Sequence, residues 1–389
     1  MKLCIVLSIL IAALYPSQWV WGSDFLSLPQ SESTISRNVE VGGGLVESEP
    51  LVPTVLGIEY WEQHSRLVAP KFHMSDSLRE EIYRFAFFNM ENLFDTWRDS
   101  LHNDEEFTPQ GSRHWTHKRL SDKMNLLWKM VAAMSQDDIS VVHYPAIIGL
   151  VEVENEWVLQ TLCRSYPLGR RYQWIHFESP DIRGVDCAML YDSTRFVPFS
   201  AYPIRVSDSA SAFYTRDILS VGGVMTASGD TAFFFVCHFP SRLGGVRAER
   251  HRQKIALLLR HSMDSLSFLH PNALVMAMGD FNCGPRSTAM QILADDSVVC
   301  NLMATLPRGE GTHYYRGYWD YLDQFLYSRN KSPLQPLQAT VFRHPSLLID
   351  DPRHQGSKPR RTFLGYRYQG GLSDHLPIYV DCKRLVDHR

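Results

Sequence analysis

A carboxylate and a carboxamide stand two residues apart at the end of an apolar segment, Ala-Met-Gly-Asp-Phe-Asn-Cys-Gly-Pro, which runs from Ala277 to Pro285. Alternate residues of a strand share a face, so Asp280 and Asn282 are predicted to project to one side of it. Such a pair can address one phosphoryl group, with the carboxylate taking a proton and the carboxamide donating a hydrogen bond. Gly, Asp and Asn are also typical of turns that leave a strand, so this segment by itself leaves both interpretations open.

Further segments place polar side chains directly after apolar, strand-like residues. Asn89 and Glu91 follow Phe-Ala-Phe-Phe. Because they are two residues apart, both side chains are predicted to lie on the same side of that strand. Glu152 follows Gly-Leu-Val, and His238 follows Phe-Phe-Phe-Val-Cys. The last such segment is Gly-Gly-Leu-Ser-Asp-His-Leu-Pro, which contains Asp374 and His375.

These residue types suit the hydrolysis of a phosphodiester, which is protected by its negative charge. The reaction needs a cation, a base that deprotonates water, and donors aimed at the developing charge. Glu152 is the best candidate for a metal carboxylate. Because the candidate ligands are oxygens and the sequence contains neither Cys-x-x-Cys nor a paired Cys and His at zinc spacing, Mg²⁺ fits best and Mn²⁺ is a possible substitute.

The five segments, joined by Tyr-Leu-Asp-Gln-Phe around Asp323, occur in an order that resembles the endonuclease/exonuclease/phosphatase superfamily, the deoxyribonuclease-I-like proteins. The resemblance covers about residues 83–380 and is closest to an exported bacterial branch. It implies a four-layer α/β sandwich, with two packed mixed β-sheets flanked by helices. It also implies a metal-dependent phosphoric ester hydrolase.

The resemblance assigns roles to most of these residues. It places Glu91 as the other acidic metal ligand and Asp374 as a ligand of a second site. It places Asp280 at the attacking water and Asn282 as a donor to the phosphoryl group, and it puts Asn89 in the metal and phosphate network. Simpler interpretations are a solvated strand-end charge for Glu91 and a turn cap for Asp374.

Two histidines have less certain assignments. His375 is predicted as the general base or as the charged partner of the scissile phosphate, and Asp323 is predicted to orient its ring, since a carboxylate behind a histidine sets its tautomer. His238 would contact the phosphate or help the leaving oxygen depart. A structural ring after an aromatic strand is the alternative for His238.

Substrate contacts are predicted from arginines near the site residues. Arg183 resembles a family position that reaches a substrate phosphate, and Tyr191 is predicted to support it. Arg242 begins a basic segment that would follow a polyanion backbone if one face gathers it, with a solvated helix start as the alternative. The other members of this segment are Arg247, Arg250, Arg252 and Lys254.

Strands and helices must bring these residues together. Apolar segments of strand length alternate with amphipathic ones, which indicates an α/β layered architecture. Residues 120–134 and 249–268 are predicted as helices, and the segment 328–371, rich in Pro, Arg and Lys, as extended surface loops. The predicted strands are 83–88, 146–151, 186–191, 231–237, 273–278, 324–327 and 376–380.

The N-terminus has the pattern of a signal peptide. Lys2 precedes an apolar stretch that ends at Leu14, which is too short to span a bilayer as a helix. We therefore predict a signal peptide over 1–22, a loosely ordered arm over 23–78 and one domain over 79–385, with a buried N-terminal helix as the alternative for the first segment. Six cysteines follow Cys4, which permits disulfides in an exported chain, or they are small buried residues.

The leading functional hypothesis is an exported, periplasmic or secreted, Mg²⁺-dependent nuclease with little sequence preference. A formal net charge of −3 excludes a globally basic nucleic-acid coat, so nucleic acid must be held by local arginines. One alternative is a phosphatase or phospholipase C-type hydrolase of inositol phosphates, sphingomyelin or other small phosphoesters. Another is a binding protein that has lost turnover. No stable membrane insertion and no protein partner are inferred, and a monomer is expected.

Overall fold

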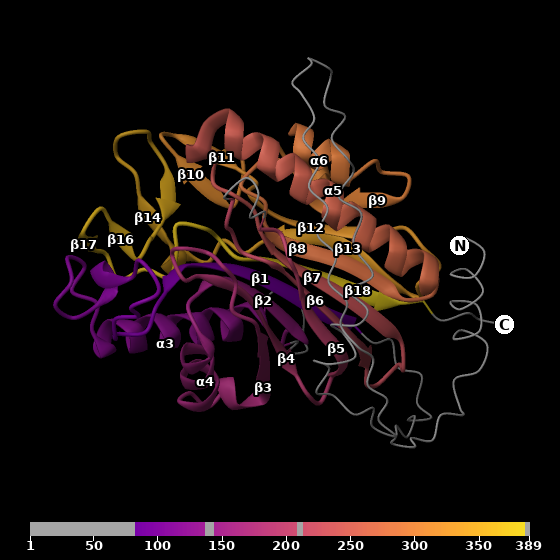
Figure 1. The fold of residues 1–389 in the computed structure, drawn as a ribbon, viewed down its shortest axis with the longest axis horizontal. Coiled ribbons are helices and arrows are strands. Elements are labelled where there is room, and N and C mark those ends of the chain that lie inside the picture. Colours follow the sequence, from indigo (N-terminus) through magenta and orange to yellow (C-terminus); the bar gives the residue numbers. More distant parts are fainter. Residues whose placement is uncertain (1–81, 137–143, 208–212, 386–389) are drawn as a thin grey trace, which may run out of the picture. The chain divides into compact units, whose positions relative to one another are not determined.

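Two six-stranded mixed sheets form the centre of the molecule in the computed structural model, which describes residues 82–136, 144–207 and 213–385 (Figure 1). The first sheet has the order β13-β18-β1-β2-β4-β3 and the second the order β5-β6-β7-β8-β12-β9. The predicted signal peptide and arm lie outside the described residues. The strands of the first sheet are β1 (Ile82–Leu93), β2 (Ile147–Val153), β3 (Tyr172–His176), β4 (Asp186–Asp192), β13 (Leu334–Val341) and β18 (Ile378–Arg384). Those of the second are β5 (Phe196–Ile204), β6 (Ile218–Met225), β7 (Thr231–His238), β8 (Leu274–Asp280), β9 (Val299–Asn301) and β12 (Asp323–Ser328).

Helices cover the outer face of each sheet, which completes four layers. In Figure 1 α3 (His117–Met134) and α4 (Glu156–Arg164) lie on one side of the sheets, and α5 (Gly245–Leu269) and α6 (Thr288–Leu293) on the other. The apolar stripe of α3 packs with the outer face of the first sheet, and α5 and α6 pack with that of the second. The predicted four-layer α/β sandwich is therefore confirmed.

Strand β1 shows why these apolar segments form central strands. Phe85 and Phe87 belong to the core between the two sheets, whereas Ala86 and Phe88 belong to the core under α3 and α4. Successive side chains of a strand point to opposite faces, so a strand with a core on both faces needs apolar residues at nearly every position. The same holds for the run of three phenylalanines in β7, which is shared between the inter-sheet core and the α5 side.

Phe234 of β7 is a key residue of the inter-sheet core. Its ring is fully buried and lies 4.9 Å, centroid to centroid, from Phe85 of the opposite sheet. Replacing Phe234 by alanine is expected to lower the free energy of unfolding by about 3–5 kcal/mol, because the cavity between two packed sheets cannot close. Chemical denaturation measures this change. The matched control is Phe268→Ala, at a ring that is 85% exposed, where a change of comparable size would contradict the argument.

The segment 328–371 differs from its prediction. It was expected to form extended surface loops, but it contains β13, an edge strand of the first sheet, and two small hairpins. The Pro-rich composition predicted loops, but an edge strand also tolerates Pro. Pro336 lies in β13 at the point where its pairing with β18 shifts register. The hairpins are β14 (Leu348–Asp350) with β15 (Ser357–Pro359) and β16 (Phe363–Leu364) with β17 (Arg367–Tyr368); a third, β10 (His313–Tyr315) with β11 (Tyr318–Asp320), precedes them.

The cysteines and helices settle two further points. Each of the six cysteines in the described residues is a buried free thiol, so in this structure they act as small apolar residues rather than as disulfide partners. Among the described helices, none combines the length and apolarity that crossing a bilayer requires.

Candidate active site

The candidate residues meet at one edge of the two sheets because they end parallel strands. β1 runs parallel to β2 in the first sheet, and β7 runs parallel to β8 in the second. Asn89 and Glu152 therefore leave the first sheet at the edge where His238 and Asp280 leave the second. Strand β12 runs antiparallel to β8 and begins at this same edge, with Asp323 opposite Asp280. The register places His238, Asp280 and Asp323 side by side across the second sheet.

Hydrogen bonds between side chains and the backbone of the following turn orient several of these residues. Asp280 Oδ1 accepts from the backbone N–H of Asn282 at 2.8 Å, and Asn89 Oδ1 accepts from the N–H of Glu91 at 2.9 Å. Glu91, Glu152 and Asn282 all have positive φ, a strained conformation for residues other than glycine. The turn interpretation of the Asp280 segment is therefore observed, and the turn leaves the second carboxylate oxygen facing the side chains of Asn89 and Asn282.

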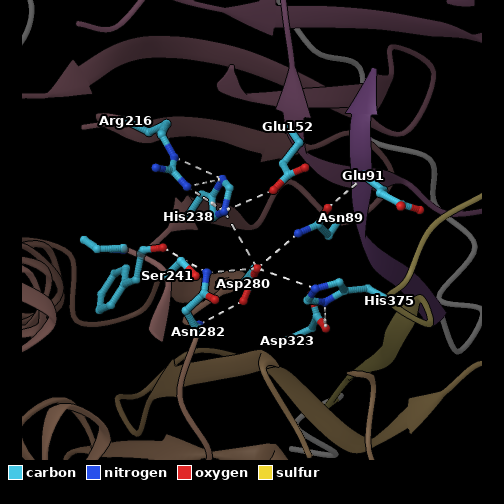
Figure 2. Close-up of polar contacts among 12 residues, drawn as sticks. Asn89, Glu91, Glu152, Arg216, His238, Ser241, Asp280, Asn282, Asp323 and His375 are labelled. Atoms are coloured by element: carbon cyan, nitrogen blue, oxygen red, sulfur yellow. Dashed lines mark hydrogen bonds and ion pairs between the residues drawn. The ribbon is translucent and has the colours of Figure 1, made fainter. Parts of the chain in front are cut away.

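Asp280 lies at the centre of the group (Figure 2). Its Oδ2 accepts from Asn89 Nδ2 at 3.0 Å and from Asn282 Nδ2 at 3.2 Å, and it lies 3.9 Å from His375 Nε2. Burial raises the pKa of this carboxyl to about 7, and the charge of His375 acts in the opposite direction. A carboxyl that titrates near neutral pH can accept a proton from water, which a fully solvated aspartate does poorly.

His375 is buried and paired with Asp323. His375 Nδ1 lies 2.7 Å from Asp323 Oδ2, so Nε2 faces Asp280. Burial by itself lowers the pKa of His375, but Asp323 and Asp280 outweigh it and raise the pKa well above 6.5. This direction is the one that the role of a charged partner of a phosphate requires.

His238 and Glu152 form the other side of the group. His238 Nε2 lies 3.6 Å from Glu152 Oε1 and 3.8 Å from Asp280 Oδ2. Arg216 packs against the imidazole, with its Nε 3.2 Å from His238 Nδ1, and Arg216 is itself paired with Asp181 at 3.0 Å. The pKa of His238 lies well below 6.5, mainly because of burial and further because of the Arg216 charge. The surroundings therefore shift the pKa values of His238 and His375 in opposite directions, so the two rings suit different tasks.

Glu91 and Asp374 lie together but apart from Asp280. Figure 2 shows the Glu91 carboxylate turned away from Asp280, because the left-handed backbone at Glu91 breaks the alternation that predicted a shared side with Asn89. Arg361 bridges the two acids, 3.1 Å from Glu91 Oε1 and 2.8 Å from Asp374 Oδ2. The expectation that Asn89 and Glu91 point to the same side is therefore wrong.

The carboxylates of this region suit a bound cation. The charges of Glu91, Asp374 and Glu152 all act on the side chains of Arg361 and Lys123, so the three predicted metal ligands share one region with two protein cations. Among the described residues, the ion pairs of Glu152 Oε1 are long, 3.6 Å to His238 Nε2 and 3.8 Å to Arg183 Nη2. An oxygen donor set of this kind fits Mg²⁺ or Mn²⁺.

The predicted substrate residues lie in different places. Arg183 is beside Glu152, and Arg242 donates to the carbonyl oxygen of Asn282 at 3.0 Å, so both border the site. Tyr191 does not, because antiparallel pairing places it opposite Ile147, at the other end of β2 from Glu152, where its ring packs on Phe196. The prediction that Tyr191 supports Arg183 is therefore contradicted.

The basic segment after His238 does not present all its charges on one surface. Arg252 is buried in α5, where it pairs with Glu249 at 2.6 Å and donates to the Pro240 carbonyl. A guanidinium held in this way cannot follow a polyanion. Arg242 is exposed and keeps its predicted place beside the site.

Sequence reasoning missed three cations of this region. Arg216 shortly precedes β6, and Arg361 lies in the segment expected to form loops. Lys123 lies on the apolar stripe of α3, where its ammonium group is buried and donates to the Glu91 carbonyl at 2.8 Å. A lysine within an apolar stripe was a usable signal, since buried lysines are almost always paired. The two arginines carried no such signal.

Arg216 gives a measurable electrostatic prediction. Replacing Arg216 by glutamine is expected to raise the pKa of His238 towards 6.5, because one of the charges that lowers it is removed while burial remains. An NMR titration of the His238 ring in chelator-treated protein measures the change. Arg205→Gln is the control, since Arg205 pairs with Asp217 and does not act on His238. Equal pKa values in the wild type and the Arg216 variant would refute the assigned interaction.

Comparisons with solved structures agree with the fold. An endonuclease/exonuclease/phosphatase family protein from Bacteroides thetaiotaomicron superposes with a TM-score of 0.53 at 14% identity, covering 80% of this chain and 98% of that one. A mannosyl-6-phosphatase from the same organism gives a TM-score of 0.51 at 16% identity, covering 77% and 99%. At these identities the likeness shows the fold alone. A search of curated protein sequences finds no significant match.

The family itself is shown by sequence. A family model described as "Endonuclease/Exonuclease/phosphatase family" matches residues 84–384, which is most of the chain and all of the strands that carry the site. Members of this family are phosphoric ester hydrolases. The chain belongs to the endonuclease/exonuclease/phosphatase family.

Proposed function

We propose that this hydrolase is an exported, Mg²⁺-dependent phosphodiesterase that cleaves DNA or RNA with little sequence preference. The observation that carries the proposal is the convergence on Asp280. Asn89, Asn282, His238 and His375 all lie within hydrogen-bond or ion-pair distance of its Oδ2, although all but Asn282 come from distant parts of the chain. A base surrounded by donors and imidazoles matches the needs of in-line attack by water on phosphorus.

Asp280 acts as the base in this proposal. Its pKa of about 7, raised by burial, suits proton transfer from an attacking water at neutral pH. Asn89 and Asn282 hold the carboxylate by donating to Oδ2, so the oxygen that takes the proton is fixed in position. A base held in place in advance loses little entropy at the moment of reaction.

The protonated His375 and the Arg216–His238 pair stabilise charge on the phosphoryl oxygens. His375 offers Nε2 to the site, while Asp323 holds Nδ1. Arg216 and Asp181 hold the neutral ring of His238. Glu152, with Glu91 and Asp374 nearby, would hold Mg²⁺, which would supply the charge neutralisation that a phosphodiester requires.

Exposed arginines support nucleic acid over a small ester. Arg183 and Arg242 border the site with side chains 43% and 48% exposed. Two accessible guanidinium groups beside the site suit the phosphates that flank a scissile bond. No element that reads base edges is evident in the sequence, so weak sequence preference is expected.

A metal-dependent activity panel tests the proposal. The purified full chain, with Mg²⁺ and separately with EDTA, is assayed against plasmid, single-stranded DNA, RNA, sphingomyelin, inositol phosphates and nitrophenyl phosphate esters. Mg²⁺-dependent cleavage of the nucleic acids is expected. Turnover of a small ester or lipid alone would replace the nuclease assignment by the phosphatase or phospholipase C-type alternative, and no turnover of any substrate would refute both.

Export is proposed on the N-terminal sequence alone. The predicted signal peptide over residues 1–22 lies outside the described residues, so the support is the charged and apolar pattern of its first half. Expression with and without this segment, followed by cell fractionation, tests it.

A further inference from the structure

Arg361 lies where two predicted metal ligands face each other. Its Nε is 3.1 Å from Glu91 Oε1, and its Nη2 is 2.8 Å from Asp374 Oδ2. The planar guanidinium presents several donors in one rigid fork, so a single arginine can hold two carboxylates that would otherwise repel each other. A lysine ammonium would not span them in the same way.

Glu91 is held by other donors as well. The backbone N–H of Thr362 donates to Glu91 Oε2 at 2.6 Å, and Lys123 donates to the Glu91 carbonyl at 2.8 Å and to Thr362 Oγ1 at 2.7 Å. The backbone N–H of Phe363 also lies 3.5 Å from Glu91 Oε1, so the two carboxylate oxygens of Glu91 accept from three protein donors. Three of the roughly four lone-pair sites of a carboxylate are then used, which leaves little capacity to coordinate an ion between Glu91 and Asp374.

Formal charges limit how many ions the region can take. Glu91, Asp374 and Glu152 bring three negative charges, and Arg361 and Lys123 bring two positive ones. With one divalent ion, the region has one net positive charge. The single negative charge of a bound phosphodiester neutralises it. A second divalent ion at Arg361 would add two more positive charges next to a guanidinium, at a cost that rises as the surroundings exclude water.

We propose that Arg361 takes the place of a second divalent ion between Glu91 and Asp374, so that the site binds one ion, on Glu152. The inference rests on the proposed metal-dependent function and specifies its metal content. Arg361 is a positioning residue here, because it acts on the two carboxylates. Asp374 is accordingly a partner of Arg361, where the sequence predicted a ligand of a second site.

Mn²⁺ stoichiometry without substrate tests this proposal. The full chain is titrated with Mn²⁺, and free Mn²⁺ is counted by its electron paramagnetic resonance signal. One bound ion is expected for the wild type and two for Arg361→Gln. The matched control is Arg360→Gln, at an exposed neighbour that donates to the Gln369 carbonyl and faces neither acid, and it is expected to bind one ion.

Two results would overturn the inference: two ions in the wild type, or one ion of unchanged affinity in Arg361→Gln. If Arg361→Gln does not fold, Asp374→Asn decides the question. It should still bind one ion, with its affinity changed by no more than about tenfold, whereas loss of that ion would make Asp374 a direct ligand and refute the proposal. The readout needs no turnover, so a wild type that binds one ion but hydrolyses no ester would refute the proposed function and leave this inference standing.

Discussion

Replacing Asp280 by asparagine is expected to slow the Mg²⁺-dependent hydrolysis of the substrate by about 10²–10⁴-fold, the usual contribution of a general base. Asparagine has the same shape and can still accept from the Asn282 backbone N–H through its amide oxygen, so the turn is retained. It loses the ability to take a proton from water, and its amide nitrogen can no longer accept from the side chains of Asn89 and Asn282. Steady-state kinetics gives the rate, and thermal unfolding shows whether the fold is intact.

Asp296→Asn is the matched control for this variant, because it makes the same change at an exposed residue remote from the strand ends of the site. Its rate should equal that of the wild type. His375→Ala should also be slow, and the double variant with Asp280→Asn should be only slightly slower than the slower single variant, since groups that act on one phosphate are not additive. A normal rate in Asp280→Asn would show that the base lies elsewhere.

Removal of the metal ion is expected to abolish activity, and loss of Glu152 should come close to this result. EDTA should reduce hydrolysis to background, and added Mg²⁺ or Mn²⁺ should restore it. Glu152→Gln keeps an oxygen that can accept from the Asn92 N–H but removes the charge that attracts the ion. We expect the Mg²⁺ concentration needed for half-maximal rate to rise about 100-fold or more, since even groups behind a metal ligand contribute roughly 10- to 100-fold in affinity.

Glu156→Gln controls for the change of charge, because Glu156 is an exposed residue in the first turn of α4, close to Glu152 in sequence. Its Mg²⁺ requirement should be unchanged. Full activity of the wild type in EDTA, or an unchanged Mg²⁺ requirement in Glu152→Gln, would be incompatible with the metal assignment.

Much of the fold was predictable because central strands have a distinctive composition. Runs such as Phe-Ala-Phe-Phe before Asn89 and Phe-Phe-Phe-Val-Cys before His238 are apolar at every position, and only a strand buried on both faces requires this. Strands nearer the edges were missed. β5 contains two prolines and β6 two adjacent glycines, and β13 carries exposed polar residues, so none of them has the composition of a central strand.

The candidate site was predictable to the extent that it depends on strand ends. The structure brings Asn89, Glu152, His238, Asp280 and His375 to one edge, as the sequence predicted. The prediction for Tyr191 was wrong because β4 begins beside Glu152, where Asp186 pairs with Val153, and carries Tyr191 to the opposite end of β2, where it pairs with Ile147. Proximity in sequence did not translate into proximity in space.

The sequence by itself determined the family, the layered fold and the chemical types of the side chains that end the strands, because these follow from local composition and spacing. Only the tertiary structure decided which groups face each other. Strand register set Asp323 opposite Asp280, left-handed backbone turned Glu91 away from Asn89, and packing between distant segments brought Arg216 to His238 and Arg361 to Glu91. Such contacts depend on segments that are far apart in the chain, and the spacing of residues within any one segment carries no information about them.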